Sequence, residues 1–341
     1  MFHVNVSLPS GRNETLLLPE HSTVGDLQVL AQQSFGQKFL RLVTSTNRGL
    51  TQPMDSLQAA GIQEGEHLTA LVQRAKIAAT SEAFAAWCCG GDRIVTWGSG
   101  LCGGDSSRVK NQLKNIQQVQ ATKWAPPGAA FAAILANGSV VTWGHPTHGG
   151  NCSSVRNQLR NVQQVEATGF AFAAILDDGS VVTWGKGIHG GDSSAVQGQL
   201  RNVQQIQATH LAFAAILADG SVVCWGDPLS GGDSSAVQGQ LRDVQQIKAS
   251  SFAFAAILAK RSAVTWGISE HGGDSLAVQD QLKNVQQIQA TGAAFAAILA
   301  DGSVVCWGDP KKGGDSSAVQ DLLSCLSNFT DLSSPFWRQH P

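Results

Sequence analysis

Two glycine-rich segments of the chain match the spacing of a dinucleotide-binding loop. Residues 98–103 and 185–190 both read Gly-x-Gly-x-x-Gly after an apolar segment, and in such a loop the glycines let backbone N–H groups approach a pyrophosphate. The motif also requires a βαβ unit and an acidic residue placed for a ribose, and neither segment has this context. The equivalent residues 145–150 lack the pattern. We therefore interpret these segments as connections between strands and expect no cofactor.

A second candidate for chemistry is a group of metal-ligand types in one loop. His145, His148 and Cys152 are spaced so that a loop could bring them to one zinc ion, but a structural zinc site takes four ligands. The other copies of this segment do without such residues, so we expect a solvated loop and no metal. The sequence contains no P-loop, no His-Glu-x-x-His and no Gly-x-Ser-x-Gly. It therefore predicts a protein without catalytic residues, which is not an enzyme.

The elements that carry these loops form an internal repeat. The pair Trp-Gly occurs six times, at intervals of 46, 41, 41, 41 and 41 residues, starting at Trp97, Trp143, Trp184, Trp225, Trp266 and Trp307. The five additional residues of the first interval lie within residues 123–128. A fixed period of this length is typical of solenoids and propellers, in which each unit buries its apolar face against the next one.

Each repeat predicts short strands and one hairpin. Residues 203–208 alternate between apolar and polar side chains, residues 213–217 are apolar, and residues 222–225 are β-branched or aromatic. Asp219-Gly220 supplies a tight turn between the last two segments. Such units can pack radially as a propeller or linearly as a β-solenoid; we favour a closed six-bladed propeller, since four-stranded blades need about 40 residues. We expect residues 316–323 to complete the blade that holds Trp97 and so to remove an exposed sheet edge.

The repeat resembles the blade of RCC1-type (regulator of chromosome condensation) propellers. In that family a Gly-x-Val-x-x-Trp-Gly hairpin follows an Ala-Leu strand, as residues 212–226 do here, and the likeness covers residues 76–323. The chain has Thr209 and its equivalents in place of the family's first glycine, and Gly-Gly-Asp-Ser in place of Gly-Gln-Leu-Gly. The resemblance implies a mainly β fold with a six-bladed RCC1-like β-propeller of 41-residue repeats at residues 76–326, followed by a C-terminal tail at residues 327–341.

Residues 1–74 do not share the repeat and predict a ββαββ order. Val4 and Val6 begin an alternating strand, and Thr23 with Asp26 resembles a capping box at the start of a helix. The order resembles the ubiquitin-like fold, which implies an N-terminal ubiquitin-like β-grasp domain. The segment lacks the Gly-Gly end that conjugation needs, because Val72 is followed by Gln73 and the first repeat.

Two groups of residues are candidates for protein binding. Pro9, Val43 and Leu71 align by position with the apolar patch that ubiquitin presents to its receptors, although Val43 and Leu71 could equally be ordinary strand residues. In the insertion, the candidates are Trp124, Pro126 and Pro127. A Trp beside two prolines offers a large apolar area at low entropic cost on binding; alternatively, it covers the edge of its own blade.

One polar column of the repeat allows two interpretations. Five carboxylates and one amide recur before Ser-Ser or its equivalent, at Asp105, Asn151, Asp192, Asp233, Asp274 and Asp315. They could form an acidic collar for a basic partner, or each could accept a hydrogen bond from the backbone two positions on as an Asx-turn. We favour the turn, because it accounts for both Asp and Asn.

Composition limits the partners. Twenty-three basic residues meet 25 acidic ones, for a formal charge of −2, so we expect no nucleic-acid partner. No apolar stretch reaches 18 residues and the N-terminus lacks the pattern of a signal peptide, so we expect no membrane association and a cytoplasmic or nuclear protein. Seven cysteines, an odd number, favour free thiols in a reducing compartment.

The sequence therefore favours a non-enzymatic protein-interaction scaffold. We expect an adaptor whose propeller holds an unidentified client and whose ubiquitin-like domain binds ubiquitin receptors or proteasome-type partners. Resemblance offers two alternatives. One is an RCC1-type guanine nucleotide exchange factor for a small GTPase, and the other is a relative or partner of the HERC-type ubiquitin ligases, which carry RCC1-like propellers, without their catalytic HECT domain.

Overall fold

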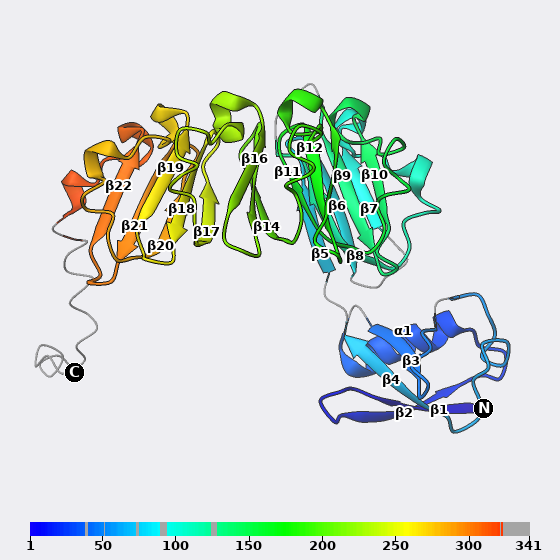
Figure 1. The fold of residues 1–341 in the computed structure, drawn as a ribbon. Coiled ribbons are helices and arrows are strands. Elements are labelled where there is room, and N and C mark those ends of the chain that lie inside the picture. Colours follow the sequence, from blue (N-terminus) through cyan, green and yellow to red (C-terminus); the bar gives the residue numbers. More distant parts are fainter. Residues whose placement is uncertain are drawn as a thin grey trace, which may run out of the picture. The chain divides into compact units, whose positions relative to one another are not determined.

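The chain divides into two compact units. The structure is a computed structural model that describes residues 1–37, 40–50, 52–72, 75–88, 94–123, 128–320 and 322 (Figure 1). The units are composed as follows: the first unit of Met1–Ile77, Ala85–Val95 and Leu113–Gln118, and the second of Ala78–Phe84, Thr96–Gln112 and Val119–Pro341.

The N-terminal residues form a mixed four-stranded sheet with one helix. The elements are β1 (Phe2–Ser7), β2 (Asn13–Leu18), α1 (Val24–Phe35), β3 (Leu40–Thr44) and β4 (His67–Val72). The sheet order is β2-β1-β4-β3, with β1 and β4 parallel and the other pairs antiparallel. This element order is the one that the sequence predicted.

Local side-chain chemistry fixes the start of α1, and apolar packing holds it on the sheet. Thr23 accepts a hydrogen bond from the Asp26 backbone N–H at 3.2 Å, and Asp26 accepts one from the Thr23 N–H at 2.8 Å. The predicted capping box is therefore present. The core joins α1 to the inner face of the sheet and includes Val4, Leu27 and Leu68.

The remaining described strands form six three-stranded sheets, one for each repeat. We number the repeats 1 to 6 in chain order. Their strands are β5 (Ala75–Ala79), β6 (Ala83–Cys88) and β7 (Ile94–Gly98); β8 (Ile116–Ala121), β9 (Ala130–Leu135) and β10 (Val140–Gly144); β11 (Val162–Ala167), β12 (Ala171–Leu176) and β13 (Val181–Gly185); β14 (Val203–Ala208), β15 (Ala212–Leu217) and β16 (Val222–Gly226); β17 (Val244–Ala249), β18 (Ala253–Leu258) and β19 (Ala263–Gly267); β20 (Val285–Ala290), β21 (Ala294–Leu299) and β22 (Val304–Gly308). The described fold is thus mainly β and repetitive, as predicted.

Short helical turns follow the third strand of each repeat. They are η1 (Gly100–Cys102), η2 (Ser107–Val109), η3 (Pro146–His148), η4 (Gly187–His189), η5 (Pro228–Gly232), η6 (Ser269–His271), η7 (Leu276–Val278), η8 (Pro310–Lys312) and η9 (Ser317–Val319). The described sheets therefore have three strands and not four, because the segment after the Gly-Gly pair forms turns and does not extend.

In repeats 2 to 5 the middle strand is buried, because it lies between two neighbours of its own sheet and packs against the adjacent repeats. In repeat 4, Phe213 is fully buried and stacks on Trp225 with ring centroids 5.1 Å apart. The Asp-Gly turn forms as predicted: Asp219 accepts from the Ser221 N–H at 2.9 Å, and Gly220 has a φ of +76°.

Consecutive repeats are joined by one recurring contact. The Trp225 Nε1–H donates to the carbonyl of Gly190 in the preceding repeat at 3.0 Å, and the ring of Phe213 lies against the same glycine. Gly190 has a φ of +96°, and a Cβ there would collide with that ring. The bond recurs at 3.0 or 3.1 Å in five pairs: Trp143 with Gly103, Trp184 with Gly149, Trp225 with Gly190, Trp266 with Gly231, and Trp307 with Gly272.

The segment expected to close a ring lies elsewhere. The sequence predicted that residues 316–323 would complete the sheet that holds Trp97. In the structure, Gln320 donates through Nε2 to the Val304 carbonyl of its own repeat at 3.5 Å, and Gln238 makes the same bond to Val222 at 2.9 Å. Each such segment thus covers the edge strand that precedes it, and among the described residues Trp97 and Gly313 do not meet. Asp321 and Leu323 of the predicted segment lie outside the described residues.

Candidate functional site

Asx-turns shape one rim of the repeat array. In each repeat the carboxylate or amide oxygen accepts from the backbone N–H two residues on, at 2.8 to 3.0 Å; the pairs are Asp105 with Ser107, Asn151 with Ser153, Asp192 with Ser194, Asp233 with Ser235, Asp274 with Leu276, and Asp315 with Ser317. The N–H bond favours the ionised form and lowers the pKa of Asp105, Asp192, Asp233 and Asp315. The turn interpretation of this column is therefore confirmed.

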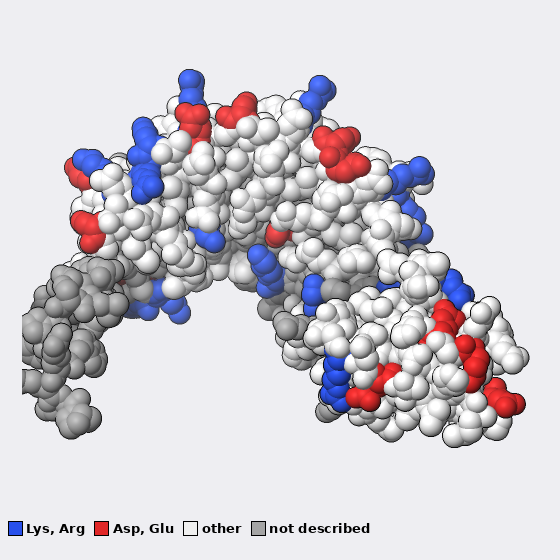
Figure 2. All heavy atoms as spheres, turned by 90° about the horizontal axis from the view of Figure 1, so that it is seen from below, with Lys and Arg blue, Asp and Glu red and all other residues white. Residues whose placement is uncertain are grey.

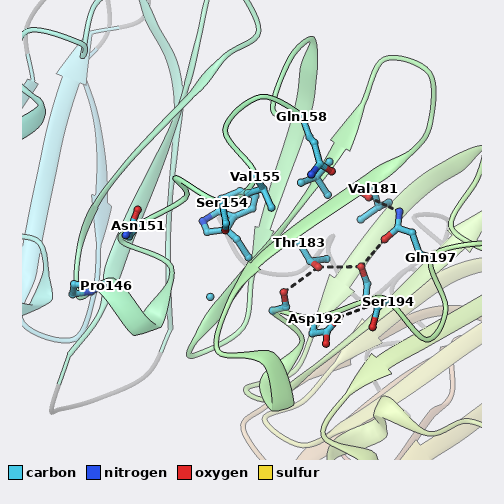
Figure 3. A pocket seen from close by; sticks show the side chains of 15 residues that line it. Pro146, Asn151, Ser154, Val155, Gln158, Val181, Thr183, Asp192, Ser194 and Gln197 are labelled. Atoms are coloured by element: carbon cyan, nitrogen blue, oxygen red, sulfur yellow. Dashed lines mark hydrogen bonds between the residues drawn. The ribbon is translucent and has the colours of Figure 1, made fainter.

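A polar groove runs along this rim between repeats 2 and 3 (Figure 3). It has a volume of about 600 Å³, with Asn151 and Val155 on one side and Asp192 on the other. Hydrogen bonds fix the second wall: the hydroxyls of Thr183 and Ser193 lie 3.0 Å apart, and Ser193 also bonds to Gln197 at 2.8 Å. The wall is therefore rigid and presents oxygen and nitrogen atoms in fixed positions.

The same groove recurs between repeats 5 and 6. It has a volume of about 660 Å³, and Asp274 and Val278 lie where Asn151 and Val155 lie in the first groove. Asp309 and Lys311 add charges that the first groove lacks. Both grooves present hydroxyl and carboxylate groups, which can form hydrogen bonds with an extended polar ligand such as a polypeptide.

The opposite edge of the sheets carries smaller grooves at the Gln-Gln column. Gln163 and Gln164 line a groove of about 400 Å³, and Gln204 and Gln205 line one of about 380 Å³ in the following repeat. Gln204 is exposed and Gln205 is half-buried. The Gln pairs therefore form a partly solvated strand face.

The three candidate metal ligands that the sequence did not favour as a zinc site do not all come together in the fold. His145 and His148 come together, with their Nδ1 atoms 2.8 Å apart, whereas Cys152 is buried in the apolar core between repeats 2 and 3. Burial, and then the neighbouring His145 and Lys186, lowers the pKa of His148 to about 4. Among the described residues, no group of three His, Cys, Asp or Glu side chains could hold a metal ion.

An aromatic row extends from His148 into the next repeat, and sequence reasoning missed it. His148 lies 4.8 Å from the ring of Phe170, which lies 4.7 Å from that of His189, and Lys186 lies over Phe170 at 5.2 Å. The signal was available as two columns of the repeat, one with His148 and His189 and one with Phe170. Only the packing of consecutive repeats brings the two columns together.

The predicted patch of the N-terminal domain is only partly exposed. Pro9 is exposed and Leu71 is half-buried on the outer face of the sheet, opposite Arg41 on β3. Val43 is only 5 % exposed, because the chain after β3 folds back and pairs Gly49 with it. Val43 therefore does not belong to an exposed patch. The other candidates, Trp124, Pro126 and Pro127, lie outside the described residues.

Burial divides the described cysteines into two groups. Cys102, Cys152 and Cys224 are buried, whereas Cys88 and Cys306 are half-buried. Burial raises the pKa of Cys224 to about 12, which makes it a poor nucleophile. Cys224 and Cys306 occupy the same strand position, and Cys224 packs in the apolar core between repeats 4 and 5.

Charges of both signs are interspersed on the face shown in Figure 2, where most of the surface is neither acidic nor basic. This distribution agrees with the formal charge of −2. Within the described part of the chain, no helix has the length and apolar character needed to cross a membrane.

Several solved structures resemble about two thirds of the chain at low identity. Human WBSCR16 is 16% identical, with a TM-score of 0.44, over 70% of this chain and 78% of that one. The ectodomain of the Physcomitrella patens receptor kinase CR4 is 15% identical, with a TM-score of 0.41, over 68% of this chain and 61% of that one. A structure of Kap60 bound to yeast RCC1 (Prp20) matches at 15% identity and a TM-score of 0.41, over 70% and 65% of the two chains. No protein-family model and no curated protein matches the sequence.

Proposed function

We propose that the protein is a non-enzymatic interaction scaffold, whose repeats hold a client protein. The observation that carries this proposal is the recurrence of the rim groove, with Asn151 and Val155 in one copy and Asp274 and Val278 in another. Repeat arrays bind proteins through surfaces that extend over several units. Hydrogen-bonded walls that present fixed donors and acceptors suit an extended polypeptide.

We further propose that the N-terminal domain links this client to receptors of the ubiquitin system. The mixed sheet and capped helix support a ubiquitin-like fold, and Leu71 offers an apolar contact on the outer face of the sheet. Pro9, exposed in the turn between β1 and β2, is the second contact that we propose. Val43 lies below this surface, so the contact that we propose rests on Leu71 and Pro9. The adaptor would then bind a receptor and a client through different residues.

The experiment is a calorimetric titration of the full chain with a peptide of a ubiquitin-interacting motif. We expect wild-type protein to bind, and Leu71→Asp to weaken binding at least tenfold, because a carboxylate in an apolar contact is left unpaired. Val29→Asp is the matched control, since Val29 is 53 % exposed on α1 and lies away from the sheet face.

Two results would contradict the proposal. Wild-type protein that releases no binding heat would refute the receptor role. Equal binding by Leu71→Asp and Val29→Asp would refute the assigned patch. Circular dichroism of both variants establishes that the loss does not come from unfolding.

A further inference from the structure

The two outer faces of the repeat array carry the two halves of the contact that joins consecutive repeats. We call the recurring contact between two consecutive repeats an internal joint. In every internal joint a tryptophan and its stacked phenylalanine contact a glycine of the preceding repeat. Repeat 1 presents the aromatic half, which we call the Trp face: Phe84 and Trp97. Repeat 6 presents the other half, which we call the Gly face: Ile298, Val304, Cys306 and Gly313.

The Trp face is open and already in the geometry of an internal joint. Trp97 is 44 % exposed, whereas its equivalent Trp225 is 4 % exposed, and Phe84 is 42 % exposed against 0 % for Phe213. The rings of Phe84 and Trp97 stack at 5.2 Å and 21°, within the range of the internal pairs. Among the hydrogen bonds of the described residues, the Trp97 indole N–H has no acceptor. The two rings of the Trp face are therefore already arranged for the contact before any partner binds.

The Gly face is open in the matching way. Gly313 has a φ of +100°, close to the +94° of Gly231, but the nearest atom to its Cβ position is Thr291 Cγ2 at 4.0 Å. At Gly231 a phenylalanine ring of the next repeat fills this space. Ile298, which is 39 % exposed, also lacks the cover that a following repeat would give.

We propose that the Gly face of one chain binds the Trp face of a second copy, head to tail. The contact continues an interface that the chain already makes five times, with Trp97 donating to the Gly313 carbonyl and Phe84 over that glycine. A second copy covers both open faces, and the internal joints do not have to change. The five Trp–Gly bonds within one chain are already formed, at 3.0 or 3.1 Å. Such a heterologous contact adds copies until a ring closes or a filament grows.

The test uses two variants of the full chain, each with one face blocked. Trp97→Ala removes the donor and its ring, and Gly313→Ala puts a Cβ where the Phe84 ring of the second copy must lie. By sedimentation velocity we expect wild-type protein to associate as its concentration rises, and each variant alone to associate at least tenfold more weakly. An equimolar mixture of the two variants retains one intact pair of faces, so it should form a heterodimer and nothing larger.

Two substitutions control for effects unrelated to the faces. Gly11→Ala introduces a side chain at a φ of +92° with no atom within 4 Å, and Leu229→Ala removes an apolar side chain that is 76 % exposed. Both should associate like wild type. Alkylation of Cys306, which lies on the Gly face, should slow as wild-type protein is concentrated and should not slow in Trp97→Ala.

The alternative occupant of both faces is the chain itself. Closure within one chain would leave wild-type protein monomeric at every concentration and would give no heterodimer on mixing. That set of results, or a mixture of variants that stays monomeric while wild type associates, would overturn the proposal.

Discussion

Replacement of the glycine at a repeat joint should destabilise the array far more than the same replacement where no repeat follows. Gly231 lies in an internal joint with a φ of +94°, and a Cβ there would lie 2.6 Å from the ring of Phe254. Gly313 holds the same position in the last repeat at +100°, with open space around it. An alanine at either glycine strains the backbone, but only at Gly231 does its Cβ also collide with a ring.

The expected losses of stability follow from the backbone strain and the steric conflict. A side chain at positive φ costs about 1 to 2 kcal/mol, and this cost applies to both glycines. In Gly231→Ala the ring must also move to reach ordinary contact, and overpacking of this kind costs about 1 to 3 kcal/mol more. We expect Gly231→Ala to lower the free energy of unfolding by about 2 to 5 kcal/mol, and Gly313→Ala by about 1 to 2 kcal/mol.

The assay is urea denaturation of the full chain at low protein concentration, where copies do not associate. Tryptophan fluorescence and far-UV circular dichroism should report the same transition, which allows a free energy to be extracted. Equal losses in the two variants would refute the close approach of Phe254 to Gly231 and, with it, the joint.

Three further outcomes are expected. The pKa of His148 is about 4 in the folded protein, below its unfolded value, so the unfolded state binds more protons and stability should fall as the pH decreases from about 6.5 to about 4. His148→Gln should flatten this part of a plot of melting temperature against pH, and an unchanged slope would contradict the lowered pKa. Cys306 should react with iodoacetamide at neutral pH faster than the buried Cys224 at the same strand position, and peptide mass spectrometry that finds equal rates would refute the exposure of the last repeat. Trp225→Phe should lower the free energy of unfolding by about 2 to 4 kcal/mol, because it leaves a cavity and an unpaired Gly190 carbonyl; a loss below about 1 kcal/mol, smaller than an unsatisfied buried group costs, would show that the bond is not structural.

Features governed by neighbouring residues in the chain were predictable from the sequence. The capping box at Thr23, the Asp219-Gly220 turn and the Asx-turns before Ser-Ser each depend on a bond that spans two or three residues. The strand positions could be predicted from the alternation of apolar and polar side chains and from the 41-residue period, because the same pattern recurs in each copy of the repeat.

Features governed by distant contacts were not predictable in this way. The prediction that residues 316–323 complete the sheet that holds Trp97 was wrong, because Gln320 bonds to Val304, 16 residues before it, and the sequence does not show in which direction this segment folds. Val43 lies on the outer side of β3, but the chain that returns through Gly49 covers it. The row from His148 to Phe170 depends on the packing of one repeat against the next.

The most direct test of the adaptor role is a methyl NMR titration of the full chain with a ubiquitin-interacting-motif peptide. We expect saturable chemical-shift changes at the methyl groups of Leu71 and at neighbouring methyl groups on the outer face of the sheet. The methyl groups of the repeats, such as those of Val155 and Val278 in the rim grooves, should keep their positions. Shifts confined to the repeats, or no shifts at saturating peptide, would contradict it.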